Sequence, residues 1–209
     1  MTDFSKLPLE QFLAALASDA PTPGGGTAAA VAGAMGASLA EMVAQLTLSK
    51  EKYAASHEAV RPIAEAGQLA RAEFLSLARE DAEAYDGVVA ARRMPKDTEA
   101  EKASRLQQIA VASRNATEVP MRTAQAAIRL LAALPELAEK GNPNAVSDVG
   151  AAALLLDACV EGALLNVGIN LSGIEDATFV AEMHRETAIL QEESQRLRSQ
   201  VVALVRKRF

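Results

Sequence analysis

The sequence of 209 residues contains few of the residues that commonly build β-sheets, disulfides and metal sites. It has no tryptophan, one cysteine and two histidines, and aromatic residues make up only 3%. The single cysteine, Cys159, excludes a disulfide within the chain and fits a reducing compartment. Strands are enriched in aromatic and β-branched residues, whereas 45 of the residues here are alanine. The composition therefore predicts an all-α protein with closely packed helices.

Net positive charge and long apolar runs are also missing. The 21 basic and 27 acidic residues give a net charge of −6, which argues against a protein that binds nucleic acid. The longest weakly polar run, Thr27 to Ala40, is shorter than the roughly 20 residues that a membrane-spanning helix needs. The first residues lack the pattern of a signal peptide. We therefore expect a cytoplasmic protein that binds neither nucleic acid nor a membrane.

Helical periodicity extends through the chain and is interrupted at clusters of proline, glycine and asparagine. Thr98 and Glu101 match a capping box, and Ser147 is predicted to be the N-cap of its helix. Pro62 predicts a kink or a new start, and Pro120 a bend. No linker is visible, so residues 1–209 are predicted to form a single-domain, up-and-down bundle of about five to six main helices. The predicted helices cover about 7–18, 27–48, 52–93, 98–134, 147–167 and 176–208.

Three consecutive glycines follow two prolines directly before an apolar helix. Glycine permits positive φ angles and lets a ligand or another backbone approach closely. The N-terminus of the following helix presents unpaired N–H groups that suit an anion or a carbonyl oxygen. A tight turn with close helix packing explains the same residues equally well. The candidate binding loop consists of Pro23, Gly24, Gly25 and Gly26.

Asp81 interrupts an apolar helical stripe that includes Phe74, Leu77, Tyr85 and Val88. A buried carboxylate without a partner is unfavourable, and the usual relief is a raised pKa. Such a carboxyl is suited to general acid–base catalysis. An ion pair with an arginine, or a stripe edge open to water, explains the same position. The helical spacing alone favours this structural interpretation.

Asp148, Asn166 and Asn170 lie on the helix predicted at 147–167 or just beyond it. Asp148 is in the first turn, where the helix dipole favours negative charge. Asn166 and Asn170 share one face and could form a platform of two amides beyond the C-terminal end of the helix. At about 1.5 Å per residue, Asp148 and Asn166 are roughly 27 Å apart. They therefore bind opposite ends of a long ligand, or belong to sites completed by another subunit, or one of them is structural.

Lys50 and Lys96 are candidates to neutralise an anionic ligand, because they lie at predicted helix ends or turns. Free surface lysines explain each of them as well. The two histidines have no second histidine or cysteine at ligand spacing. We therefore expect no metal site.

Five segments resemble, in the same order, the cyclodeaminase/cyclohydrolase family that acts on one-carbon tetrahydrofolates. They are PTPGGGTAAAVAGAMGASLAEMVAQLTLSKEKY, DAEAY, MPKDTEAEK, GNPNAVSDVGAAA and GALLNVGINL. The family includes the C-terminal domain of formiminotransferase-cyclodeaminase and the free-standing methenyltetrahydrofolate cyclohydrolases of bacteria. The resemblance implies a helical fold, a homodimer and a tetrahydrofolate ligand, with no metal and no further cofactor.

The resemblance also implies roles for individual residues. Asp81 matches the aspartate regarded as the catalytic acid of the family, which reverses the preference for a structural role. Lys50 and Lys96 are expected to receive the anionic, possibly polyglutamylated tail of the folate. Thr27, Ser49 and Tyr85 replace the serine, glycine and phenylalanine that are usual in the family. Folate-binding roles are expected for Pro23, Gly24, Gly25, Gly26, Lys50, Lys96, Asn142, Ser147, Asp148, Asn166 and Asn170.

The implied reaction is the hydrolysis of 5,10-methenyltetrahydrofolate to 10-formyltetrahydrofolate, with Asp81 as general acid and base. The alternative is cyclodeamination of 5-formiminotetrahydrofolate, which closes the ring and expels ammonia. A third interpretation is a helical module that binds folate without turnover. We favour the cyclohydrolase because the chain has no transferase domain and its length matches the free-standing bacterial enzymes.

Overall fold

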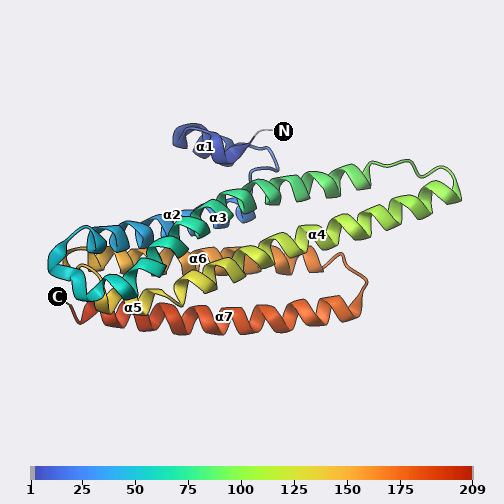
Figure 1. Ribbon diagram of the computed structural model, residues 1–209. Coiled ribbons are helices and arrows are strands. Elements are labelled where there is room, and N and C mark those ends of the chain that lie inside the picture. Colours follow the sequence, from blue (N-terminus) through green and yellow to red (C-terminus); the bar gives the residue numbers. More distant parts are fainter. Residues whose placement is uncertain (1–2, 209) are drawn as a thin grey trace.

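The computed structural model describes residues 3–208, which form helices and turns with no strand. The long helices run up and down along one bundle (Figure 1), so the predicted all-α, up-and-down architecture is confirmed. They are α2 (Gly25–Leu48), α3 (His57–Arg92), α4 (Glu99–Leu131), α6 (Val146–Leu171) and α7 (Ala177–Arg206). Shorter elements are η1 (Phe4–Lys6), α1 (Leu9–Leu16), η2 (Glu51–Ser56), α5 (Leu134–Lys140) and η3 (Pro143–Ala145).

The helix ends follow the sequence signals in part. Thr98 and Glu101 form the predicted capping box, in which each side chain accepts a hydrogen bond from the other residue's backbone N–H. α3 and α4 each continue through their internal prolines, so no new helix starts at Pro62. The prediction that Ser147 is an N-cap is wrong. The turn η3 leads directly into α6, so helical backbone begins at Val146 and Ser147 lies inside the first turn.

Small residues allow α2, α3 and α6 to pack closely. A Cβ atom at Gly33 of α2 would lie 2.7 Å from Phe74 of α3 and 2.8 Å from the Sγ of Cys159 of α6. Gly36 is in similarly close contact with Leu156 of α6. Cys159 is fully buried, and this burial raises the pKa of its thiol to about 12. The cysteine is therefore a core residue of this helix crossing.

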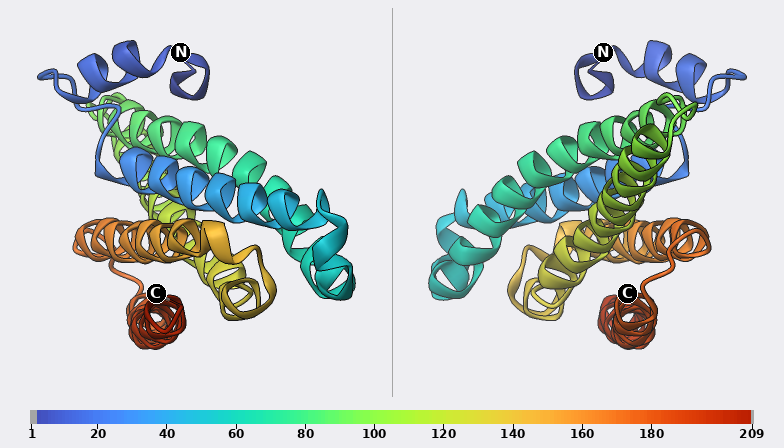
Figure 2. Two further views of the ribbon diagram at one scale, coloured as in Figure 1. Left: turned by 90° about the vertical axis from the view of Figure 1, so that its left-hand side faces the viewer. Right: turned by 90° about the vertical axis from the view of Figure 1, so that its right-hand side faces the viewer.

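α2 lies between α3 and α6, and α7 covers the outer side of α6. Because α3 is longer than α2, the hairpin of α3 and α4 extends beyond the N-terminus of α2 (Figure 1). α1 lies apart from the bundle, on the side opposite to α7 (Figure 2). The N-terminus of α2 is thus next to the middle of α3, at the base of the projecting hairpin.

α2 and α6 leave an apolar face uncovered. By length and composition alone, Gly25–Leu48 and Pro143–Leu171 are apolar enough to cross a membrane. The prediction that no segment is long and apolar enough for a membrane-spanning helix is therefore wrong. In the bundle, 56% and 44% of their most apolar windows are buried, as in core helices of a folded domain. We call the exposed remainder the α2–α6 face. Its large side chains are Met35, Met42, Leu46, Leu154, Leu165 and Ile169.

The close helix crossing predicts that Gly33→Ala destabilises the protein by about 1–3 kcal/mol, because Phe74 and Cys159 must move away from the new methyl group. Gly87→Ala is the matched control, since no atom lies within 4 Å of a Cβ at that position in α3. The control should gain about 0.5–1 kcal/mol from the better helix propensity of alanine. Urea unfolding followed by circular dichroism measures both changes. Equal stabilities of the two variants would contradict the close crossing.

Candidate active site

Asp81 of α3 meets the N-terminus of α2. Its Oδ2 accepts a hydrogen bond of 2.8 Å from the hydroxyl of Thr27, and the backbone of Thr27 also hydrogen-bonds to the carboxylate. Gly24, the N-cap of α2, has no side chain with which to accept from these N–H groups. Asp81 therefore provides, from another helix, an acceptor that the first turn of α2 lacks.

Burial and hydrogen bonding shift the pKa of Asp81 in opposite directions. Loss of hydration raises the pKa, whereas the hydroxyl and backbone hydrogen bonds of Thr27 lower it, and the net effect is a pKa above the ordinary value. No ion pair among residues 3–208 includes Asp81. The carboxyl is partly buried beside a threonine rather than paired with an arginine, so its environment is that of a group able to hold and release a proton.

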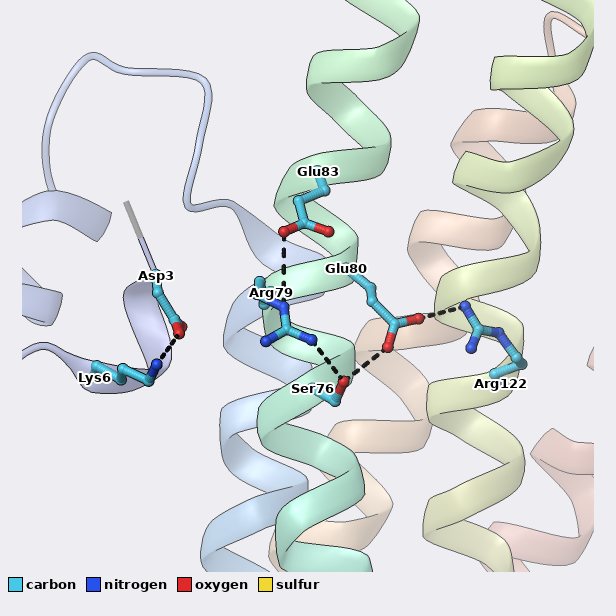
Figure 3. Close-up of polar contacts among 7 residues, drawn as sticks. All are labelled: Asp3, Lys6, Ser76, Arg79, Glu80, Glu83 and Arg122. Carbon is cyan, nitrogen blue, oxygen red and sulfur yellow. Dashed lines mark hydrogen bonds and ion pairs between the residues drawn. The ribbon is translucent and has the colours of Figure 1, made fainter. Parts of the chain in front are cut away.

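Glu80, the neighbour of Asp81 in the sequence, has the opposite environment. Figure 3 shows its carboxylate directed towards α4, where it accepts a hydrogen bond from Arg122 at 2.7 Å. It accepts a second, of 2.9 Å, from Ser76 of its own helix α3. Although burial raises the pKa of Glu80, these hydrogen bonds hold it below its ordinary value. Adjacent carboxyls on one helix therefore have oppositely shifted pKa values, raised for Asp81 and lowered for Glu80.

Gly26 is the loop glycine on which this contact depends. A Cβ at Gly26 would lie 2.7 Å from the Cγ of Asp81, closer than real Cβ contacts allow. Gly25, in contrast, is exposed, and a Cβ there would make only ordinary contact with Asn166 at 3.4 Å. The expectation of positive φ angles is wrong for the described residues, because Gly25 and Gly26 already belong to the first turn of α2. Gly26 instead allows the close approach of the Asp81 carboxyl.

The remaining loop residues and the two asparagines of α6 lie at the same end of the bundle. Pro23 is buried and Gly24 is partly exposed. Asn166 lies beside Gly25, and its amide donates to the carbonyl of Gly162 at 2.8 Å. Asn170 donates to the carbonyl of Ala116 at 2.7 Å and so connects α6 to α4. The predicted platform beyond the helix end is wrong, because α6 continues to Leu171 and contains both asparagines.

The other predicted binding residues lie at the opposite end of α2. Lys50 follows α2, and Ser147 and Asp148 are in the first turn of α6. α2 spans Gly25–Leu48, so its helical rise separates the two ends by about 35 Å. A single chain therefore does not bring these residues to Asp81. Lys96 is also distant, since it is exposed in the turn at the tip of the α3–α4 hairpin.

Asn142 anchors a polar cluster at this distant end. Its backbone N–H donates to the hydroxyl of Thr47 at 2.9 Å, and its Oδ1 accepts from the hydroxyl of Tyr53 at 3.0 Å. The same Oδ1 also accepts from the backbone of Asn144. The sequence does not predict the contacts of Tyr53 and Thr27, because each residue lies far along the chain from its partner. The hydroxyl groups alone gave no signal of these contacts.

Two clefts border the part of α3 around Asp81. One, of about 210 Å³, lies against the N-terminal segment and is lined by Thr22, Ala82 and Glu83, among others. The other, of about 620 Å³, lies between α3 and α4 and includes Ala84 and Gly87. Among residues 3–208, no three His, Cys, Asp or Glu side chains are placed to hold a metal ion together.

Comparison with known proteins gives consistent matches. A family model described as formiminotransferase-cyclodeaminase matches residues 8–189. The chain is 38% identical over 200 residues to methenyltetrahydrofolate cyclohydrolase of Methylorubrum extorquens, with 96% of each protein covered. It is 35% identical to formimidoyltransferase-cyclodeaminase of Rattus norvegicus, covering 88% of this chain but only 34% of that protein. The crystal structure of formiminotetrahydrofolate cyclodeaminase from Thermotoga maritima matches with a TM-score of 0.87, 33% identity and 97% coverage of both chains.

The geometry predicts different effects at two adjacent glycines. Gly26→Ala should displace Asp81 from the first turn of α2, destabilising the protein by about 1–3 kcal/mol, because the new methyl group overlaps the carboxyl. Gly25→Ala, the matched control, should change stability by less than about 0.5 kcal/mol because it makes only ordinary contacts. Denaturant unfolding measures both. A Gly26→Ala variant as stable as the control would show that the carboxyl does not lie against this turn.

Proposed function

The chain belongs to the formiminotransferase-cyclodeaminase family, and we propose that it is an enzyme of one-carbon folate metabolism that hydrolyses 5,10-methenyltetrahydrofolate to 10-formyltetrahydrofolate. Coverage of 96% in both directions with the Methylorubrum extorquens cyclohydrolase supports hydrolysis as the main reaction. Cyclodeamination of 5-formiminotetrahydrofolate is the second candidate, supported by the similarity to the Thermotoga maritima cyclodeaminase over 97% of both chains.

The environment of Asp81 is the observation that supports catalysis. The carbon to be hydrolysed bridges N5 and N10 of the folate in a cationic unit. Water adds to this carbon while the Asp81 carboxylate takes a proton from the water. The protonated carboxyl then donates to N5 as the bond between the carbon and N5 breaks. The remaining hydroxyl loses its proton as the formyl C=O forms on N10, so one proton is released overall.

A raised pKa suits both steps of this reaction. Since burial makes the ionised form of Asp81 less favourable, the carboxylate accepts the water proton more readily than a fully hydrated aspartate would. In its ionised form, the same group stabilises the cationic substrate. The mechanism needs no metal, because one carboxyl supplies both the base and the acid. We place the substrate against the partly exposed backbone of Gly24 and Gly25, beside Asn166.

We further propose that the active form is a homodimer that meets through the α2–α6 face. This face carries six exposed large apolar side chains from the two most apolar of the long helices. α2 and α6 are antiparallel neighbours, since Gly25 lies beside Asn166 at one end and Thr47 contacts Asn142 at the other. A two-fold axis across their midpoint therefore places the Asp81 end of one copy beside the Lys50 end of the second copy.

Such a dimer joins the two groups of predicted binding residues. Lys50 of the second copy then lies near the folate and can receive its anionic tail. Tyr53 and Asn142 come to the same site in this arrangement. Asp148 and Asn166 lie at opposite ends of the bundle. The separation of these ends along α2 favours the alternative in which another subunit completes each site.

A turnover assay tests the proposed reaction. The purified protein should accelerate the loss of the methenyltetrahydrofolate chromophore, and Asp81→Asn should lower kcat by about 10²–10⁴-fold while the folate still binds. Asp19→Asn, at an exposed aspartate, is the matched control and should keep its activity.

The outcomes separate the candidate functions. Faster release of ammonia from 5-formiminotetrahydrofolate than loss of the methenyl chromophore would establish the cyclodeaminase. Tight binding of both folates without any turnover would establish a binding module and overturn the catalytic proposal. An Asp81→Asn variant with nearly full activity would exclude Asp81 as the acid.

Mixed dimers test the composite site. Lys50→Ala should weaken binding of the folate tail, so at low folate concentration this variant and Asp81→Asn should both have little activity. When the two chains are unfolded, mixed and refolded together, half of the dimers should be mixed, and each of these has one intact site. Activity should therefore return to about a quarter of the wild-type value. A mixture that stays inactive although it forms mixed dimers would place both residues in sites of a single chain.

A second pair of variants checks where the copies meet. Leu165→Arg in both chains puts a charge on the α2–α6 face. It should give monomers in sedimentation, and activity should not return when the two chains are mixed. Leu106→Arg is the control, because Leu106 is similarly exposed but lies on the projecting part of α4. It should leave the recovery intact.

A further inference from the structure

We propose that Thr27 is a positioning residue for Asp81, and that its hydroxyl holds the carboxyl in the orientation that catalysis needs. The inference rests on the proposed function and extends it to a residue outside the predicted site. The hydroxyl of Thr27 donates to Oδ2 of Asp81 at 2.8 Å, across 54 residues of sequence. No side-chain hydrogen bond of the described residues reaches Oδ1, which lies against Gly26.

Other buried threonines of the protein show that this hydrogen bond is unusual. Thr47, Thr117 and Thr123 donate their hydroxyls to the carbonyls of Val43, Ser113 and Val119, four residues earlier in the same helix. A buried threonine inside a helix commonly satisfies its hydroxyl in this way. All three hydroxyls therefore donate within their own helix, although that of Thr47 also accepts from the backbone N–H of Asn142.

Thr27 differs because of its position in α2. It is the third residue of the helix, so the residue four positions earlier, Pro23, precedes the helix. The hydroxyl of Thr27 is then free to reach α3, and the side chain is fully buried, so no water competes for it. A donor that is fixed by burial and directed at an ionisable oxygen restricts the carboxyl more strongly than an exposed one.

A purely structural role for Thr27 makes a different prediction. If the hydroxyl only supports the junction of α2 and α3, then activity should fall in parallel with stability. If the hydroxyl positions Asp81, activity should depend on the hydroxyl while stability also depends on the buried methyl group. Serine and valine separate these contributions, because serine keeps the hydroxyl and valine keeps the shape of threonine.

The experiment compares Thr27→Ser and Thr27→Val in the dimeric protein. Thr27→Val should lower kcat for methenyltetrahydrofolate hydrolysis by about 10–100-fold with little change in KM, as expected when a hydrogen bond to a charged group is lost. Thr27→Ser should keep kcat within about threefold of the wild type, although it leaves a cavity where the methyl group was. Thr123→Val, which removes a hydroxyl that bonds only within α4, is the matched control and should keep full activity.

The order of Thr27→Ser and Thr27→Val in kcat, compared with their order in stability, decides the question. The proposal requires serine to exceed valine in kcat, whatever their order in resistance to urea. Equal kcat values for the two variants, or a higher kcat for Thr27→Val than for Thr27→Ser, would overturn it while leaving the proposed function intact. If the wild-type protein itself has no turnover, the proposed function fails instead, so the two failures are distinguishable.

Discussion

The contact between the Asp81 carboxyl and the first turn of α2 is the interaction on which the site depends. The start of a helix needs acceptors for its free N–H groups, and a partly buried carboxyl needs donors. Each requirement is met by the other, since Thr27 provides a hydroxyl and a backbone donor. The contact is possible only because residue 26 has no Cβ. A glycine, a threonine and an aspartate from two helices thus form one unit.

In this unit, opposing effects on the pKa of Asp81 give a carboxyl that suits acid–base chemistry. Burial opposes its charge, the hydrogen bonds support it, and the pKa settles above its ordinary value. Glu80, one residue earlier, faces α4 and Arg122, and its pKa is lowered. Successive residues of a helix point in different directions, so adjacent carboxyls have entirely different surroundings. The ion pair of Glu80 fastens α3 to α4 and leaves Asp81 as the carboxyl directed at α2.

α2 and α6 connect the core to the proposed assembly. One side of each helix packs inside the bundle through residues such as Gly33 and Cys159, whereas the other side exposes large apolar residues. Burial of such side chains on association is favourable in proportion to the area removed from water. The same antiparallel pair separates Asp81 from Lys50 within one chain. The proposed two-fold arrangement gives that separation a function, because each end then meets the opposite end of another copy.

The sequence by itself determined the helical class, the capping box at Thr98 and the position of Asp81 on an apolar helical stripe, because these depend on local spacing and composition. It also pointed to the family through the glycine loop and the DAEAY segment. Only the tertiary structure decided that the partner of Asp81 is Thr27 and that Gly26 rather than Gly25 is the critical glycine. It also placed Lys50 far from Asp81 within one chain, and α6 beyond the end predicted for it. Helical periodicity tells which way a side chain faces but not what it meets, since that depends on helices brought together from distant parts of the chain.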